Sequence, residues 1–169
     1  SGQVIPNVSL RASTGNTPGA GPTGDCVGEG DVALTDSNGI ATCNLAVGGR
    51  LGIAPLQVVV GGTINLGGSS LNLDVRPGPP STIRLVQGNN QSGAPGERLR
   101  LAFVAEVSDA FGNVLPNVAG QWEVPVPNSI TLANIVGTSD STGRVSALGT
   151  LGTVPGSNVV RYRVGNASG

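Results

Sequence analysis

The sequence predicts an all-β protein built from two tandem β-sandwiches. Three observations support this: apolar residues alternate with period two in short segments, turn-forming residues interrupt the chain densely, and one stretch of sequence occurs twice. The 169 residues include 28 Gly and 12 Pro but no Met, and all 9 basic residues are Arg. No segment shows a 3.6-residue period, which argues against a helical bundle.

The clearest strand pattern lies at residues 98–107. Its apolar side chains occupy every second position, which is typical of a strand with one buried face. These residues are Leu99, Leu101, Phe103, Ala105 and Val107. A turn is predicted directly afterwards, at residues 109–113, because Asp and Gly favour tight turns.

Further short strands are predicted before and after this segment. Apolar residues also alternate at 56–60, 71–75, 118–124 and 160–164, and Ile83 and Leu85 open the second half of the chain. Trp122 shares one face of its segment with Val118 and Val124. We therefore expect Trp122 to anchor a core, with a sugar-stacking platform as the alternative.

Two short motifs occur twice in the chain. Gly2–Val8 (GQVIPNV) matches Gly112–Val118 (GNVLPNV), and Thr35–Gly39 (TDSNG) matches Ser139–Gly143 (SDSTG). The first pair is offset by 110 positions and the second by 104, so the first copy holds six extra residues between its motifs. These residues are predicted to lengthen a loop that contains Cys26.

The two copies cover different parts of the repeat. The second has Ser81–Phe111 ahead of its matched start, whereas the first continues through Leu71–Arg76 beyond the matched end. We therefore expect the first sandwich to lack its opening strands and the second its closing strand. Neighbouring repeats or identical subunits are the expected partners, and they would complete the open sheet edges.

The sequence Pro77-Gly78-Pro79-Pro80 separates the two copies. Proline fixes φ and has no N–H, so Pro77, Pro79 and Pro80 predict a semi-rigid linker and hinge rather than a strand. The predicted domains are residues 1–76, an incomplete sandwich, and residues 81–169, with the linker at 77–80. A whole repeat of this kind has the size of an immunoglobulin-like domain.

Cys26 and Cys43 lie 17 positions apart. A disulfide between them would staple the lengthened loop and stabilise the fold by about 3 kcal/mol. A reactive thiol pair is the alternative. We favour the disulfide because the rest of the sequence is typical of an extracellular protein.

The residue types that are missing exclude several functions. The chain has no His and no Lys, which removes Ser-His-Asp catalysis, His-ligated metals and Schiff-base chemistry. The carboxylates are spread thinly and suggest no catalytic pair. We therefore predict no enzyme, no catalytic residue and no cofactor. A net charge of −1 disfavours a nucleic-acid partner, and the short apolar runs disfavour membrane insertion.

Three aspartates, Asp36, Asp109 and Asp140, precede a glycine in predicted turns. Each is a candidate calcium ligand, because calcium binds carboxylate oxygens. We favour an Asx turn at each site, in which the carboxylate accepts local N–H bonds, because calcium loops gather several carboxylates and these stand almost alone.

Several pieces of the chain resemble a known family. They are Ser81–Gly96, Val107–Val118, Ser139–Val145 with Leu148 and Gly149, and, in the first copy, Leu34–Ala41. These pieces resemble bacterial immunoglobulin-like repeats of the group 1 type, found in intimin- and invasin-like adhesins. The resemblance implies tandem immunoglobulin-like sandwiches in an exported bacterial protein, with no catalytic residues.

The predicted function is therefore an architectural or adhesive segment, a stalk or spacer, of a bacterial surface or matrix protein outside the cell. A host or matrix surface ligand is a candidate partner. The alternative is a subunit or segment of an extracellular filament joined by donated β-strands. A carbohydrate-binding module is disfavoured because the few aromatic residues follow a core pattern.

Overall fold

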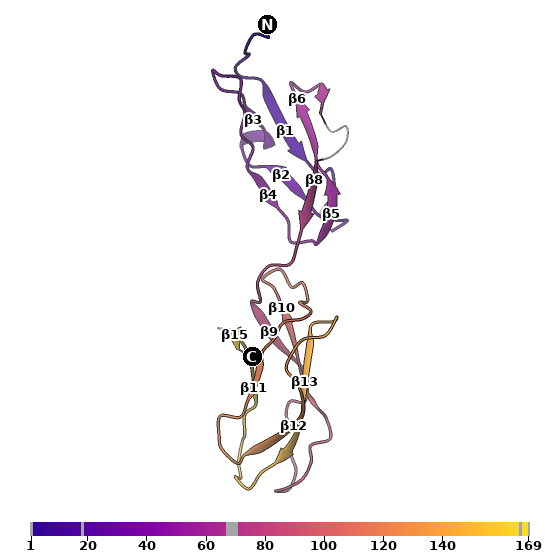
Figure 1. Ribbon diagram of the computed structural model, residues 1–169, viewed down its shortest axis with the longest axis vertical. Coiled ribbons are helices and arrows are strands. Elements are labelled where there is room, and N and C mark those ends of the chain that lie inside the picture. The colour runs from indigo at the N-terminus through magenta and orange to yellow at the C-terminus, as the bar shows by residue number, and fades with distance from the viewer. Residues whose placement is uncertain (1, 18, 67–70, 166, 169) are drawn as a thin grey trace. The chain divides into compact units, whose positions relative to one another are not determined.

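The computed structural model describes residues 2–17, 19–66, 71–165 and 167–168 (Figure 1). The all-β prediction is confirmed: the described residues form strands, turns and one short 3-10 turn, η1 (Glu29–Asp31). The chain divides into two compact units, Ser1–Arg76 and Pro77–Gly169. Within the described ranges, no helix is long and apolar enough to cross a membrane.

The second unit is a sandwich of two antiparallel sheets. One sheet has the strand order β12-β13-β10-β9 and the other the order β11-β14-β15. The strands are β9 (Thr82–Gln87), β10 (Phe103–Ser108), β11 (Gln121–Glu123), β12 (Ile130–Val136), β13 (Arg144–Leu151), β14 (Arg161–Val164) and β15 (Ala167–Ser168).

The core of the second unit lies between these sheets. Its central residues are each at most 5% exposed: Ala105, Val107, Leu115, Val145 and Tyr162. Trp122 packs against this cluster from β11, with its ring centroid 5.1 Å from that of Tyr162. Ala105 and Val107 are both buried on the same face of β10, as the period-two pattern predicts. Tyr162 is likewise the buried residue of β14.

The strand predicted at 98–107 is shorter than its pattern indicates, because β10 begins only at Phe103. The side chain of Gln91 explains the difference. It accepts a hydrogen bond from the Leu101 amide over 2.8 Å and donates one to the Leu101 carbonyl over 2.9 Å. The side-chain amide of Gln91 thus occupies the backbone N–H and C=O of Leu101, which a neighbouring strand would otherwise bond. Leu101 is 49% exposed and does not join the core.

The first unit is a six-stranded antiparallel sheet with a separate two-stranded pair. The sheet has the order β4-β2-β1-β6-β7 with β3 beside β1, and β5 pairs with β8. The strands are β1 (Ser9–Ser13), β2 (Gly24–Cys26), β3 (Ala33–Leu34), β4 (Leu45–Val47), β5 (Gly52–Pro55), β6 (Gln57–Val60), β7 (Ile64–Asn65) and β8 (Asn72–Val75).

One strand pair has the same register in both units. In the first unit β1 pairs with β6, and in the second unit β11 pairs with β14 at the positions offset by 110 and 104. The residue pairs Arg11–Val59, Ala12–Val58 and Ser13–Gln57 correspond to Gln121–Arg163, Trp122–Tyr162 and Glu123–Arg161. The sequence repeat is therefore a repeat of backbone structure as well.

The duplicated motifs form the same hydrogen bonds in both units. The Ser139 hydroxyl donates to the Leu115 carbonyl over 2.6 Å and accepts from the Val118 amide over 2.9 Å. In the first unit the Thr35 hydroxyl does the same with the Ile5 carbonyl and the Val8 amide, over 2.8 and 2.9 Å. Each hydroxyl thus links the two motifs of its own copy.

Candidate functional site

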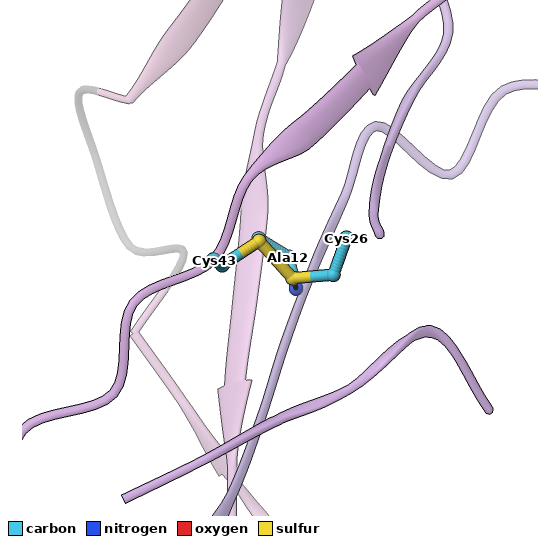
Figure 2. The surroundings of a disulfide bond; sticks show 3 residues. All are labelled: Ala12, Cys26 and Cys43. Carbon is cyan, nitrogen blue, oxygen red and sulfur yellow. Dashed lines mark hydrogen bonds between the residues drawn. A yellow bond between two sulfur atoms is a disulfide. The ribbon is translucent and has the colours of Figure 1, made fainter. Parts of the chain in front are cut away.

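The predicted disulfide joins Cys26 on β2 to Cys43, which lies just before β4 (Figure 2). The two Cα atoms are 5.4 Å apart. Cys26 is 2% exposed, and its Sγ atom accepts a hydrogen bond from the Ala12 amide over 3.3 Å. The Cys26 end of the disulfide therefore lies in the interior of the first unit, whereas Cys43 is half-buried. No cysteine is left to act as a free thiol.

The three candidate calcium ligands, Asp36, Asp109 and Asp140, all lie in one type of turn. In each, the carboxylate accepts the amides two and four residues ahead, and the glycine three residues ahead has a positive φ. This is a three-residue hairpin loop closed by a left-handed glycine. No group of three or more metal-ligating side chains occurs in the described residues. Each of the three carboxylates accepts backbone amides of its own turn.

Asp109 is the most strongly held of the three carboxylates. The Asn113 side chain donates to it over 2.9 Å, and this bond contributes most to lowering the pKa of Asp109 to about 2. The amides of Asn113, Gly78 and Phe111 lower it further. Asp109 is 2% exposed, which makes it a buried structural carboxylate rather than an open ligand.

The carboxylates of the other two turns are held by fewer bonds. The Ile40 amide contributes most to lowering the pKa of Asp36, and the hydroxyl of Thr142 contributes most to lowering that of Asp140. Both aspartates are exposed.

The bond between Asp109 and Gly78 also fixes part of the predicted linker. The Gly78 amide donates to Asp109 over 3.1 Å, and Pro77–Pro80 falls within the second unit. A hinge at these prolines stays a prediction.

Trp122 is partly buried between neighbouring aromatic rings. Its ring centroid lies 6.5 Å from that of Phe103 and 5.1 Å from that of Tyr162. Its indole N–H donates to the Val136 carbonyl over 3.3 Å. Trp122 also lines a cavity of the second unit.

The first unit has an open edge at the place where β10 lies in the second unit. There, the Val107 amide donates to the Gly143 carbonyl over 2.8 Å, and the Leu115 amide donates to the Val107 carbonyl over 2.9 Å. The equivalents of Gly143 and Leu115 are Gly39 and Ile5. Neither the Gly39 carbonyl nor the Ile5 amide has a partner among the described residues, and Ile5 is 63% exposed whereas Leu115 is 5% exposed.

The second unit has a groove of about 450 Å³ between its sheets, which we call the β14-side groove. Its floor includes Phe103, Trp122 and Ile130. One wall is the segment 156–160, which leads into β14, and the other is formed by Leu85 and residues 88–92. A volume of this size lies within the range of roughly 300–1,000 Å³ found for ligand sites.

From the sequence we expect the second unit to lack its closing strand, but the sequence does not locate this groove. Apart from Leu85 and Gln91, its walls consist of Gly, Ser, Asn and Val, which show no alternation. Its aromatic floor comes from Phe103 and Trp122, which are 19 positions apart. The useful signal is the repeat itself, because residues 156–160 align with 52–56 at the offset of 104.

Comparison with known proteins adds little to this geometry. No family model and no curated protein sequence matches the chain. Among solved structures, the chain is similar to the crystal structure of domains 4 and 5 of the S-layer protein SbsC, with 13% sequence identity and a TM-score of 0.42. The match covers 80% of this chain and 85% of the other. A similarity at this level supports no argument about function.

Proposed function

We propose that the chain is an architectural segment, a stalk or spacer, of an exported bacterial surface or matrix protein. The observation that carries this proposal is the duplicated backbone: one strand pair has the same register in both units, and both contain the same hydroxyl-centred hydrogen-bond network. Tandem units built alike are typical of repeat arrays whose role is to span distance and present a surface.

The Cys26–Cys43 disulfide supports a role outside the cytoplasm, because disulfides persist in oxidising compartments. The carboxylates of the three turns hold backbone amides, which fits an architectural role. The resemblance to group 1 immunoglobulin-like repeats points the same way, and it makes an adhesive surface for a host or matrix ligand the finer form of this role.

A filament subunit joined by donated strands is the second candidate function. The open edge of the first unit favours it, because unpaired strand edges in proteins readily accept a strand from another chain. Electron micrographs of the purified chain test it: fibres that survive mild denaturant support the filament, and isolated particles reject it.

Surface labelling tests the main proposal. Antibodies raised against the purified chain are applied to intact and to permeabilised source cells, with a cytoplasmic protein as the control. We expect labelling of intact cells, at the outer surface or in the surrounding matrix. Labelling that requires permeabilisation would contradict an exported architectural role.

A further inference from the structure

The first unit shows how a strand fills the edge that is open in the second. β8 lies antiparallel to β5 (Figure 1). Leu73 stands opposite Ala54, and the Leu56 amide donates to the Leu71 carbonyl over 2.8 Å. Leu73 reaches toward β2: its Cδ2 atom lies 2.7 Å from the place where a Cβ on Gly24 would stand. Beside it, Ala54 is only 1% exposed.

The β14-side groove occupies the same place in the repeat. Gly52 at the start of β5 corresponds to Gly156, and both have a positive φ, 127° and 109°. Gly24, which faces Leu73, corresponds to Ile130, since these residues begin the equivalent strands β2 and β12. Yet within the described ranges no strand pairs with residues 156–160.

The groove offers partners both for the backbone of a β-strand and for its apolar side chains. The floor is apolar, and the wall at 156–160 offers backbone groups with which no other strand in the described part of the chain pairs. None of the described residues that line the cavity is charged, so an ionic ligand would find no counter-charge among them. An extended peptide fits both sides, because its backbone pairs with the wall while every second side chain enters the floor.

We propose that the β14-side groove is the seat of a β-strand with apolar residues at alternate positions, the pattern of Leu71–Val75. The strand lies antiparallel to residues 156–159, and its central apolar residue stands opposite Asn158, the equivalent of Ala54. The occupant is polypeptide that continues from β15, as β8 follows β7 in the first unit. The inference rests on the proposed function, because such a strand completes one unit of a tandem array.

The test transplants the strand from the first unit. A copy of residues 66–76 is added directly after Ser168, in place of Gly169, because Ser168 pairs with Arg163 as Asn65 pairs with Val59. The matched control carries Leu73→Asp in the added copy, because a buried carboxylate without a partner strongly disfavours docking. Two readouts report on the groove: acrylamide quenching of Trp122, the single tryptophan, and amide exchange at Val160, the equivalent of Leu56.

The added strand is expected to shield Trp122 and to slow exchange of the Val160 amide by at least about tenfold, as strand pairing protects backbone amides. The control extension should change neither. Equal effects from both extensions, or none from either, would overturn the proposal. So would a dimer of the unextended chain, seen by sedimentation, that shields Trp122 equally, because a second copy would then fill the groove.

This experiment and the surface labelling fail separately. If intact cells are labelled but the transplanted strand leaves Trp122 and Val160 unchanged, the strand seat is wrong and the architectural role stands. If the strand docks but labelling requires permeabilisation, the exported role is wrong and the groove still binds a strand.

Discussion

Two hydroxyl side chains, those of Thr35 and Ser139, hold equivalent positions but have different surroundings. Ser139 is 3% exposed, and its acceptor residue Leu115 is 5% exposed. Thr35 is only partly buried, and its acceptor residue Ile5 is 63% exposed. The same pair of hydrogen bonds therefore lies in a closed core in one unit and beside water in the other.

This contrast predicts unequal effects of the same deletion. Ser139→Ala leaves the buried Leu115 carbonyl and the partly buried Val118 amide without their partner, which costs about 1–3 kcal/mol of unfolding free energy. Thr35→Ala costs less, about 0.5–1 kcal/mol, because water replaces the hydroxyl. Urea unfolding followed by Trp122 fluorescence measures the first variant, and amide exchange of the first unit measures the second. Equal losses would show that the first unit is closed at this point.

The carboxylate of Asp109 predicts the pH dependence of the second unit. Its pKa in the fold is about 2, below the value of about 3.9 for an unfolded aspartate. Its ionised form therefore stabilises the fold above about pH 4, and this contribution is lost as the pH falls toward 2.

Thermal unfolding between pH 5 and pH 2, followed by Trp122 fluorescence, measures this dependence. Asp109→Asn should lower the midpoint at pH 5 and flatten the pH dependence. Asp36→Asn, in the equivalent type of turn in the first unit, is the control and should leave the fluorescence transition unchanged. An undiminished slope in Asp109→Asn would show that other carboxylates carry it.

At the scale of elements, alternation predicted the strands whose inward residues are large. β14 follows its pattern because Tyr162 is buried between exposed arginines. β13, the longest strand, was missed because its inward residues are Val145, Ala147 and Gly149. Gly149 is small for a reason: a Cβ there would lie 2.7 Å from Cε2 of Phe103. A local sequence pattern does not reveal close packing against an aromatic ring that is distant in the sequence.

The sequence predicts which kinds of candidate site are present, but it predicts their positions only in part. The disulfide and the Asx turns follow from residue types and spacing, and the structure shows both. The two hydrogen bonds between the Gln91 side chain and the Leu101 backbone could not be predicted, because the two residues are ten positions apart. The groove depends on the packing of two sheets, which no single segment encodes.

The disulfide predicts a selective effect of reduction. In the described part of the first unit, the buried residues with apolar side chains are Ala12, Pro22, Cys26 and Ala54, so its core is thin. Closing a loop between cysteines 17 positions apart contributes about 3 kcal/mol. Reduction, or Cys26→Ala with Cys43→Ala, should therefore unfold or strongly destabilise the first unit, as measured by amide exchange. Trp122 fluorescence should not change, and a matching loss in the second unit would contradict this account.

At the scale of the whole molecule, the first unit should unfold at a lower urea concentration than the second. The second unit buries Val107, Val145 and Tyr162 at no more than 1% exposure, whereas no Leu, Ile, Val or Phe is buried in the described part of the first. Circular dichroism should show two urea transitions. Trp122 fluorescence should follow only the later one, and its coincidence with the earlier transition would reverse the order.

In the proposed role, these residues are one segment of a larger array whose open edges are completed by the same polypeptide. The most direct test is the denatured, intact mass of the polypeptide that carries these residues in its native source. We expect a mass far above the 16.7 kDa of the 169 residues. A mass near 16.7 kDa would contradict it, because the open edges would then have to be completed by other copies, as in a filament.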